Sequence, residues 1–237
     1  MSWRGSIFTL FFLLLSGCAS MSDEEAAQDP LEPFNRSMFA LNEHIDTYVA
    51  RPVARFYQKI TPEPVDRGIT NFFNNLDEVP TALNNLLQFK PRAALNDLGR
   101  LVINTTVGVL GFMDPATEMG LERHDEDFGQ TLGRWGVPPG PYLVLPIIGP
   151  NDFRDTLGFG VDWVSNPIYY RIGDNDAGWA LWILRYVDRR ADLLRAQRVL
   201  ESAAMDRYIF TRESYLQRRR YQVYDGNPPD DFEDELD

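Results

Sequence analysis

The side chains that most often catalyse reactions or bind metals are sparse in this chain. Its 237 residues include two histidines and one cysteine. His44 and His124 stand outside His-Glu-x-x-His and other metal-binding spacings, and no Gly-x-Ser-x-Gly elbow marks a serine nucleophile. Carboxylates abound, but in an acidic chain their positions single out no general acid or base. The sequence gives no positive reason to predict an enzyme or a bound cofactor.

One acidic stretch, residues 122–129 (ERHDEDFG), does gather oxygen ligands. Asp125, Glu126 and Asp127 are residue types that bind Ca²⁺, but the spacing of an EF-hand loop is absent. We therefore predict no metal site. No glycine-rich phosphate loop follows a strand, so nothing indicates nucleotide binding.

The single cysteine, Cys18, points to lipid attachment. A short basic start precedes the apolar segment Ile7–Leu15, which is too short to span a bilayer, and Leu-Ser-Gly-Cys at 15–18 resembles a bacterial lipobox. We predict that residues 1–17 are a signal peptide and that Cys18 is acylated at its thiol and its new amino group. Ala19 in place of aspartate favours the outer membrane. The alternative is an ordinary signal peptide with an incidental cysteine.

The net charge of the chain limits the kinds of molecule that the protein is expected to bind. The chain has 23 basic and 35 acidic residues, a formal net charge of −12, which argues against nucleic acid and against electrostatic attachment to anionic lipid. Only Lys59 and Lys90 among the basic residues are lysine. Arginine binds phosphate through a planar fork, although coding bias explains this preference equally well.

Apolar residues recur at helical spacing through most of the chain, and strict alternation is scarce. We predict a mainly α single domain over 29–224, after a polar tether at 18–28 and before an acidic disordered tail at 225–237. The predicted helices include stripes at Met38–Tyr48, Val65–Leu76, Val79–Leu87 and Leu95–Val102, and longer helices over 178–204 and 206–222. Each stripe by default faces the core, whereas the abundance of aromatic residues suggests lipid contact.

The segment 136–150 (GVPPGPYLVLPIIGP) is unusual because it is apolar yet holds five prolines and three glycines. Proline removes a backbone donor and fixes φ, so the segment is predicted to be an irregular loop and not a helix or a central strand. Irregular apolar backbone suits a wall that is buried in protein or lines a cavity.

Several motifs together resemble the MlaA (VacJ) family of outer-membrane lipoproteins. They are the lipobox, DPLEPFNR at 29–36, NLLQ at 85–88, NTTVGVLGFMD at 104–114, DFGQTLG at 127–133, WGV at 135–137, GPYL at 140–143, LP at 145–146, GP at 149–150 and RD at 154–155. The resemblance covers about residues 29–220.

The resemblance implies a compact ring of amphipathic helices in the inner leaflet of the outer membrane, with an amphipathic pore. Such a protein associates with trimeric porins and removes mislocalised phospholipid from the outer leaflet. It passes the lipid to a periplasmic carrier of the Mla pathway and so maintains lipid asymmetry.

Candidate site residues follow from this expectation. The lipid path is predicted to include Trp135, Tyr142, Leu143, Val144, Leu145, Ile147 and Ile148. Arg36 and Arg134 are candidates for contact with the phosphate of the headgroup, although Arg36 can equally pair with Glu32 four residues earlier. Without the resemblance, the apolar loop reads more simply as a buried structural element.

Two other functions fit the same sequence. One is a structural, porin-associated lipoprotein that conducts no lipid. The other is a lipid-modifying enzyme that uses carboxylates which the sequence does not single out. The scaffold predicts that loop substitutions act only through stability, and the enzyme predicts that one Asp or His substitution abolishes activity in a folded protein.

Overall fold

The computed structural model describes residues 29–167, 176–203 and 206–229. Cys18, the predicted signal peptide, the predicted tether and residues 230–237 lie outside this part. The described elements are α3 (Glu32–Ile45), the π-helical turn η1 (Asp46–Ala50), α4 (Arg51–Ile60), α5 (Glu63–Leu87), α6 (Pro91–Thr106), α7 (Pro115–Glu118), α8 (Phe128–Arg134), β1 (Tyr142–Leu145), β2 (Gly149–Asp152), α9 (Phe153–Ser165), α11 (Asp176–Ala203) and α12 (Arg207–Val223). The prediction of a mainly α fold is confirmed.

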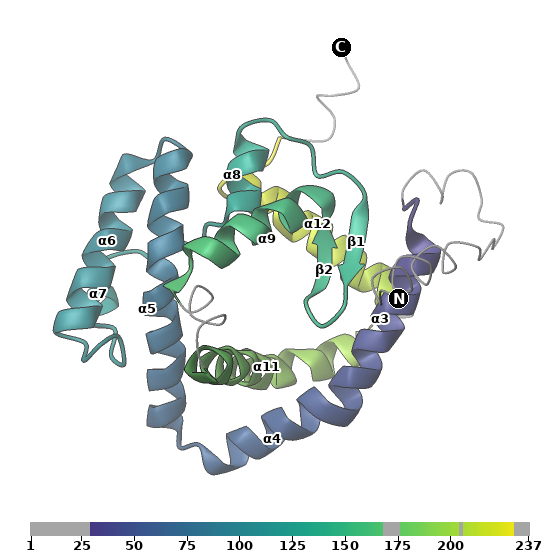
Figure 1. The fold of residues 1–237 in the computed structure, drawn as a ribbon, viewed down its shortest axis with the longest axis horizontal. Coiled ribbons are helices and arrows are strands. Elements are labelled where there is room, and N and C mark those ends of the chain that lie inside the picture. Colours follow the sequence, from purple (N-terminus) through teal and green to yellow (C-terminus); the bar gives the residue numbers. More distant parts are fainter. Residues whose placement is uncertain (1–28, 168–175, 204–205, 230–237) are drawn as a thin grey trace, which may run out of the picture.

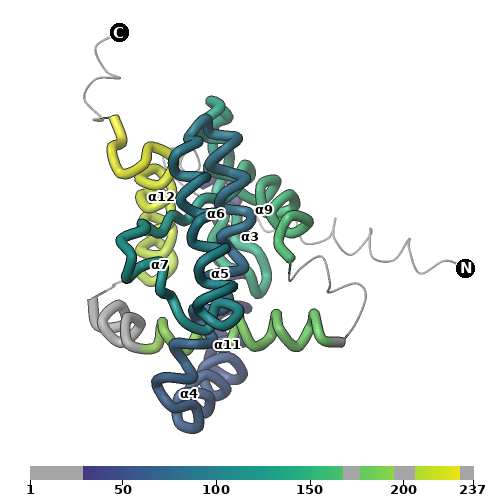
Figure 2. The backbone as a smooth tube through the Cα atoms, turned by 90° about the vertical axis from the view of Figure 1, so that its left-hand side faces the viewer, coloured from purple at the N-terminus to yellow at the C-terminus, as the bar shows by residue number. Residues whose placement is uncertain are grey.

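The helices form a ring around a central opening (Figure 1). One curved arc contains α3, η1 and α4, and α5 forms the opposite side with α6 packed on its outer face. The β1–β2 hairpin, α8 and α9 complete the circle, and α11 lies inside the arc against α4. Figure 2 shows α11 running across the ring, roughly perpendicular to α5. The predicted ring of helices is therefore confirmed.

Prolines and aspartates set the helix starts. Proline occupies the first turn of α3, α5 and α6, where its missing N–H leaves no gap in the helical hydrogen bonds. The side chains of Asp127, Asp152 and Asp206 cap α8, α9 and α12 by accepting hydrogen bonds from backbone N–H groups. The predicted helices at 178–204 and 206–222 agree with α11 and α12 to within two residues at each end.

Apolar and polar side chains are distributed in an unusual way. In the described part of the chain, the buried apolar side chains are alanines, tyrosines, Phe73, Val144 and Val223, whereas leucine, isoleucine and methionine are half-buried or exposed. Buried polar and charged side chains outnumber them. None of the described helices is both long and apolar enough to cross a bilayer. Many large apolar side chains are therefore exposed on the ring.

Ion pairs join the helices where a core of leucines would be expected. Arg100 of α6, which is 1% exposed, donates to Glu78 of α5 at 2.7 Å and to Asp114, the N-cap of α7, at 3.0 Å. Arg185 and Arg190 of α11 pair with Asp77 of α5 and Asp46 of η1, each at 2.5 Å. Buried arginines need such partners because an unpaired buried charge is costly.

The predicted irregular loop is wrong for its second half, which forms an antiparallel hairpin. Tyr142, Leu143, Val144 and Leu145 pair with Asp152, Asn151, Pro150 and Gly149. The fully buried Asn35 of α3 lines the other edge of β1, since it accepts from the Val144 N–H at 2.9 Å and donates to the Tyr142 carbonyl at 2.9 Å. The Val144 N–H therefore points away from β2. Val144 and Pro150 face each other at a position of the antiparallel ladder without hydrogen bonds, so the missing N–H of Pro150 costs no hydrogen bond there.

The predicted tail begins too early at 225. Asp225 forms ion pairs with Lys90 and Arg134, and the Gly226 N–H donates to the carbonyl of Tyr221 at 2.9 Å. The Pro229 carbonyl accepts from Arg220 at 2.8 Å. These contacts attach residues 225–229 to the folded body.

A glycine contact holds α8 against α9. A Cβ atom on Gly158 would lie 2.4 Å from the backbone nitrogen of Gly129 and 2.8 Å from its Cα, and neither atom can rotate away. Only glycine allows this approach, which places the N-terminal end of α8 beside Asp155 and Asp162 of α9.

Gly158→Ala should therefore destabilise the protein by about 2–3 kcal/mol, because the methyl group overpacks a backbone contact. Thermal unfolding in detergent micelles, followed by circular dichroism, measures the effect. Gly160→Ala in the same helix is the control, since a Cβ there meets no atom within 4 Å. It should be neutral or stabilising by up to about 1 kcal/mol through helix propensity. Equal stability of the two variants would contradict the close-contact account.

Candidate functional site

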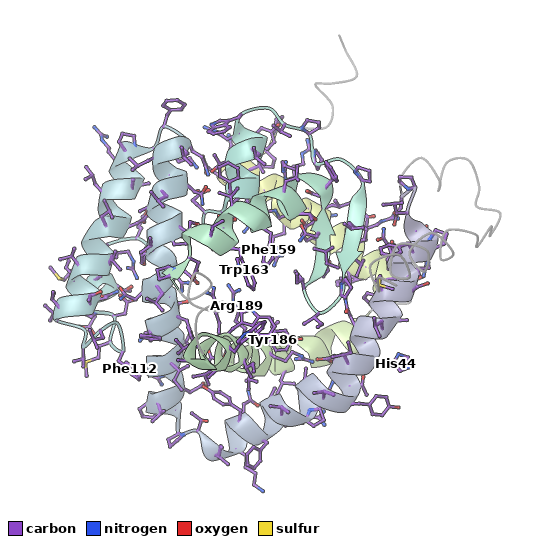
Figure 3. The ribbon with its side chains drawn as sticks, in the orientation of Figure 1. His44, Phe112, Phe159, Trp163, Tyr186 and Arg189 are labelled. Atoms are coloured by element: carbon purple, nitrogen blue, oxygen red, sulfur yellow. The ribbon has the colours of Figure 1, made fainter. Side chains whose placement is uncertain are left out.

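A polar cavity of about 710 Å³ lies among the helices that surround the opening. Its lining comes from α5, the segment before α8, the hairpin tip, α9, α11 and α12. Figure 3 shows Phe159 and Trp163 of α9 and Tyr186 and Arg189 of α11 around the opening, with Phe112 and His44 on the outer rim. Charged side chains dominate this cavity, and Ile148, Phe159 and Leu193 add apolar surface.

Arg219 of α12 organises one wall of the cavity. Its guanidinium donates to both oxygens of Asp127, at 2.6 and 2.9 Å, and forms an ion pair with Asp155 of α9. Burial raises the pKa of Asp127, but Arg219 and the N–H groups at the start of α8 outweigh that effect and hold the pKa below its usual range. Tyr215 donates to Asp155 at 2.6 Å. The cluster therefore fixes α8, α9 and α12 relative to one another.

Asp162 of α9 contributes a second carboxylate to the lining. Both its oxygens accept from the Phe128 N–H, at 3.1 and 3.0 Å, and one accepts from Asn84 of α5 at 3.3 Å. Burial raises the pKa of Asp162 to about 6, against the opposing effect of the Phe128 hydrogen bond. The negative charge at this point of the cavity is therefore only partly retained just below neutral pH.

The hairpin tip provides the apolar part of the predicted lipid path. Ile147 and Ile148 are about half exposed, and Ile148 lines the cavity. Asn42 of α3 holds the tip, because it donates to the Leu145 carbonyl at 2.9 Å and accepts from the Ile147 N–H at 2.8 Å. Ile147 has φ of 68°, which is strained for a β-branched residue. The structure thus keeps two exposed isoleucines beside the cavity.

The other hairpin residues predicted to line the lipid path are either fully buried or half-buried. Tyr142 and Val144, at 3% and 1% exposure, pack with Tyr208 and Tyr215 of α12. They face away from the cavity, so the structure does not support a place for them on a lipid path. Leu143 and Leu145 alternate with them on the strand and are half-buried. All four residues of YLVL are apolar, so residue type did not indicate this division, which follows from the two-residue period of a strand.

Trp135 lies outside the cavity lining. It follows α8, its indole N–H donates to the Leu87 carbonyl at 3.0 Å, and its ring packs edge-on against Phe128. The Trp135 side chain is about half exposed. Trp135 therefore holds the end of α5 and does not line the central cavity.

The two candidate arginines have partners elsewhere. Arg36 pairs with Glu32 at 2.6 Å and with Asp206 at 3.0 Å, and its guanidinium lies 4.5 Å from the centre of the Tyr208 ring. The alternative Arg36–Glu32 pairing is thus confirmed. Arg134 lies 3.9 Å from Asp225. Neither arginine lines the central cavity.

The acidic stretch 122–129 has structural partners. His124 lies 2.6 Å from the buried Asp97, and Glu126 pairs with Lys90 at 3.1 Å. In the described part of the chain no cluster of three or more His, Cys, Asp or Glu side chains has the arrangement of a metal site.

Sequence reasoning missed the cavity arginines. Arg185 and Arg189 are four residues apart and share one face of α11, and Arg218 and Arg219 are adjacent on α12. The spacing on α11 was a usable signal, but only ring closure shows that both helices contribute to the same cavity.

Known proteins resemble this chain along most of its length. The family model described as MlaA lipoprotein matches residues 27–222. The intermembrane phospholipid transport system lipoproteins MlaA of Shigella flexneri and of Escherichia coli K12 are each 36% identical over 231 residues, covering 95% of this chain and 91% of the relative.

A solved structure supports the same assignment. It is described as the structural basis for maintenance of bacterial outer membrane lipid asymmetry, and it matches with a TM-score of 0.73 at 35% identity, covering 82% of this chain and 98% of the other. The residues matched by the family model, 27–222, include the ring, the hairpin and the cavity lining. The chain belongs to the MlaA lipoprotein family.

Proposed function

We propose that this protein is an outer-membrane transport lipoprotein, and not an enzyme, that removes mislocalised phospholipid from the outer leaflet. The lipid enters the ring and leaves on the periplasmic side, which maintains lipid asymmetry. The observation that carries the proposal is a charged cavity of about 710 Å³ inside a ring whose exterior is apolar. The names of the relatives support the same process, since they are lipoproteins of an intermembrane phospholipid transport system.

The lining matches the two parts of a phospholipid. A headgroup carries charge and needs polar partners, which the charged side chains of α5, α9, α11 and α12 supply. Acyl tails need apolar surface, and Ile147 and Ile148 offer it at the rim. The half-buried Leu143 and Leu145 extend this surface along the hairpin. A lipid can therefore pass with its headgroup in the cavity and its tails against the hairpin.

The apolar exterior determines where the ring resides. Phe56 of α4, Leu95 of α6 and Leu110 before α7 are 61%, 69% and 66% exposed. Such a surface calls for lipid or another apolar protein surface as its neighbour. We propose that acylated Cys18 holds the ring in the inner leaflet of the outer membrane, and that a trimeric porin covers part of the exterior. A periplasmic carrier of the Mla pathway receives the lipid.

The rival function is a porin-associated scaffold that conducts no lipid. It accounts for the apolar exterior but gives no role to a charged cavity beside exposed isoleucines. The two functions differ in what they predict for substitutions at the hairpin tip.

Deletion of the gene should increase phospholipid in the outer leaflet, since the lipid is no longer removed. An added phospholipase on intact cells releases product in proportion to the exposed phospholipid. The wild-type gene should restore the low level, and Cys18→Ala should not, because the unacylated protein is not held at the membrane. Unchanged exposure after deletion would exclude inward transport.

Ile148→Asp should leave the protein folded and raise phospholipid exposure toward the level of the deletion, because a carboxylate replaces the apolar surface that meets acyl tails. Val144→Asp is the comparison within the same hairpin. It places a charge among buried aromatic rings and should cost at least about 3 kcal/mol in stability. Thermal unfolding and the phospholipase assay are measured on both variants. A folded Ile148→Asp variant with wild-type exposure would favour the scaffold.

A further inference from the structure

Two arginines face the central cavity without a protein partner. Arg189 of α11 and Arg218 of α12 are both exposed and both line the cavity of about 710 Å³. Within residues 29–167, 176–203 and 206–229, neither side chain makes a hydrogen bond or an ion pair. Figure 3 shows Arg189 at the central opening.

Their neighbours on the same helices are different. Arg185, one turn before Arg189, is bound to Asp77 at 2.5 Å, and Arg219, next to Arg218, is bound to Asp127 and Asp155. Those two arginines hold helices together and are buried. Arg185 and Arg219 therefore form the ion pairs that join the helices, whereas the guanidinium groups of Arg189 and Arg218 are available to bind a ligand.

Each of the two free arginines also lines a smaller neighbouring cavity. Arg189 also lines a smaller cavity of about 220 Å³ between α5 and α11, with Asp77 and Asp192. Arg218 also lines one of about 200 Å³ between α9 and α12, with Asp155 and Asp162. The three spaces share lining residues, so they form a succession with one free arginine at each connection.

We propose that Arg189 and Arg218 bind the phosphate of a lipid headgroup at two successive positions along the cavity. The proposal rests on the proposed function, because it assumes that the headgroup passes through this space. The planar guanidinium binds phosphate oxygens in pairs and stays charged at any physiological pH.

The surrounding carboxylates keep such binding weak. Asp125, Asp162 and Asp192 line the same cavity and repel a phosphate that lingers. Conduction through a polar passage needs binding that is favourable enough for entry and weak enough for release. Two arginines set among carboxylates meet both conditions, and the carboxylates also suit an ammonium group on the same headgroup.

Native mass spectrometry of the full-length acylated protein in detergent tests the proposal. Wild type, Arg189→Gln, Arg218→Gln and the double variant are each incubated with dioleoylphosphatidylethanolamine or with dioleoylglycerol, which has the same tails and no phosphate. Each single variant should retain the phospholipid at least about fivefold less than wild type, and the double variant still less, with retention of dioleoylglycerol unchanged. Arg55→Gln is the control, because Arg55 is exposed on α4 and lies outside these cavities.

Three results of the binding experiment would overturn the proposal. Phospholipid retention could stay within twofold of wild type in the double variant, or both lipids could be lost equally. Displacement of the phospholipid by millimolar inorganic phosphate would show that the site takes free phosphate. The phospholipase assay keeps the proposed function separate, since a double variant that restores low exposure to the deletion strain would reject the arginine sites and leave the transport function standing.

Discussion

The ring depends on arginines that are neutralised by carboxylates from other helices. Arg100 links α6 to α5 and α7. Arg185 and Arg190 connect α11 to α5 and to η1. Arg219 of α12 binds Asp127 before α8 and Asp155 of α9. A helix pair in a water-soluble domain usually meets through fully buried leucines and isoleucines, whereas the described leucines and isoleucines of this chain are half-buried or exposed. Because removing one partner of a buried pair leaves an uncompensated charge, the pairs hold the helices in one arrangement. They also place charged side chains on the inside of the ring.

The polar contacts between the helices and the apolar exterior of the ring are related. If the large apolar side chains were buried in the core, the ring would expose less apolar surface to lipid. Here the core uses alanine, tyrosine and ion pairs, and the leucines, valines and phenylalanines of α4, α6 and the segment before α7 remain outside. None of the described helices is long and apolar enough to cross a bilayer, so the apolar surface is formed by several helices together.

The sequence predicts the local features of this structure well and the distant ones poorly. Helical spacing and proline positions place α6, α11 and α12 correctly, because those signals act within a few residues. The hairpin was predicted as an irregular loop because its second edge partner, Asn35, lies 107 residues before Tyr142. Arg36 is likewise bound by Asp206, 170 residues away. The cavity arginines come together only when α11 and α12 close the ring, so spacing alone cannot pair them.

The central claim is that the inside of the ring meets water and the outside meets lipid. Leu193→Cys and Leu95→Cys test it directly, since the two leucines are 57% and 69% exposed and only Leu193 lines the cavity. Cys18 is the single native cysteine, and its thiol is predicted to be acylated, so each new thiol is read without background. A charged thiosulfonate reagent, which reacts with the hydrated thiolate, is added to isolated outer membranes. The account predicts that Leu193→Cys is labelled and Leu95→Cys is not, while both are labelled after unfolding in detergent. Labelling of Leu95→Cys in the membrane, or protection of Leu193→Cys, would contradict it.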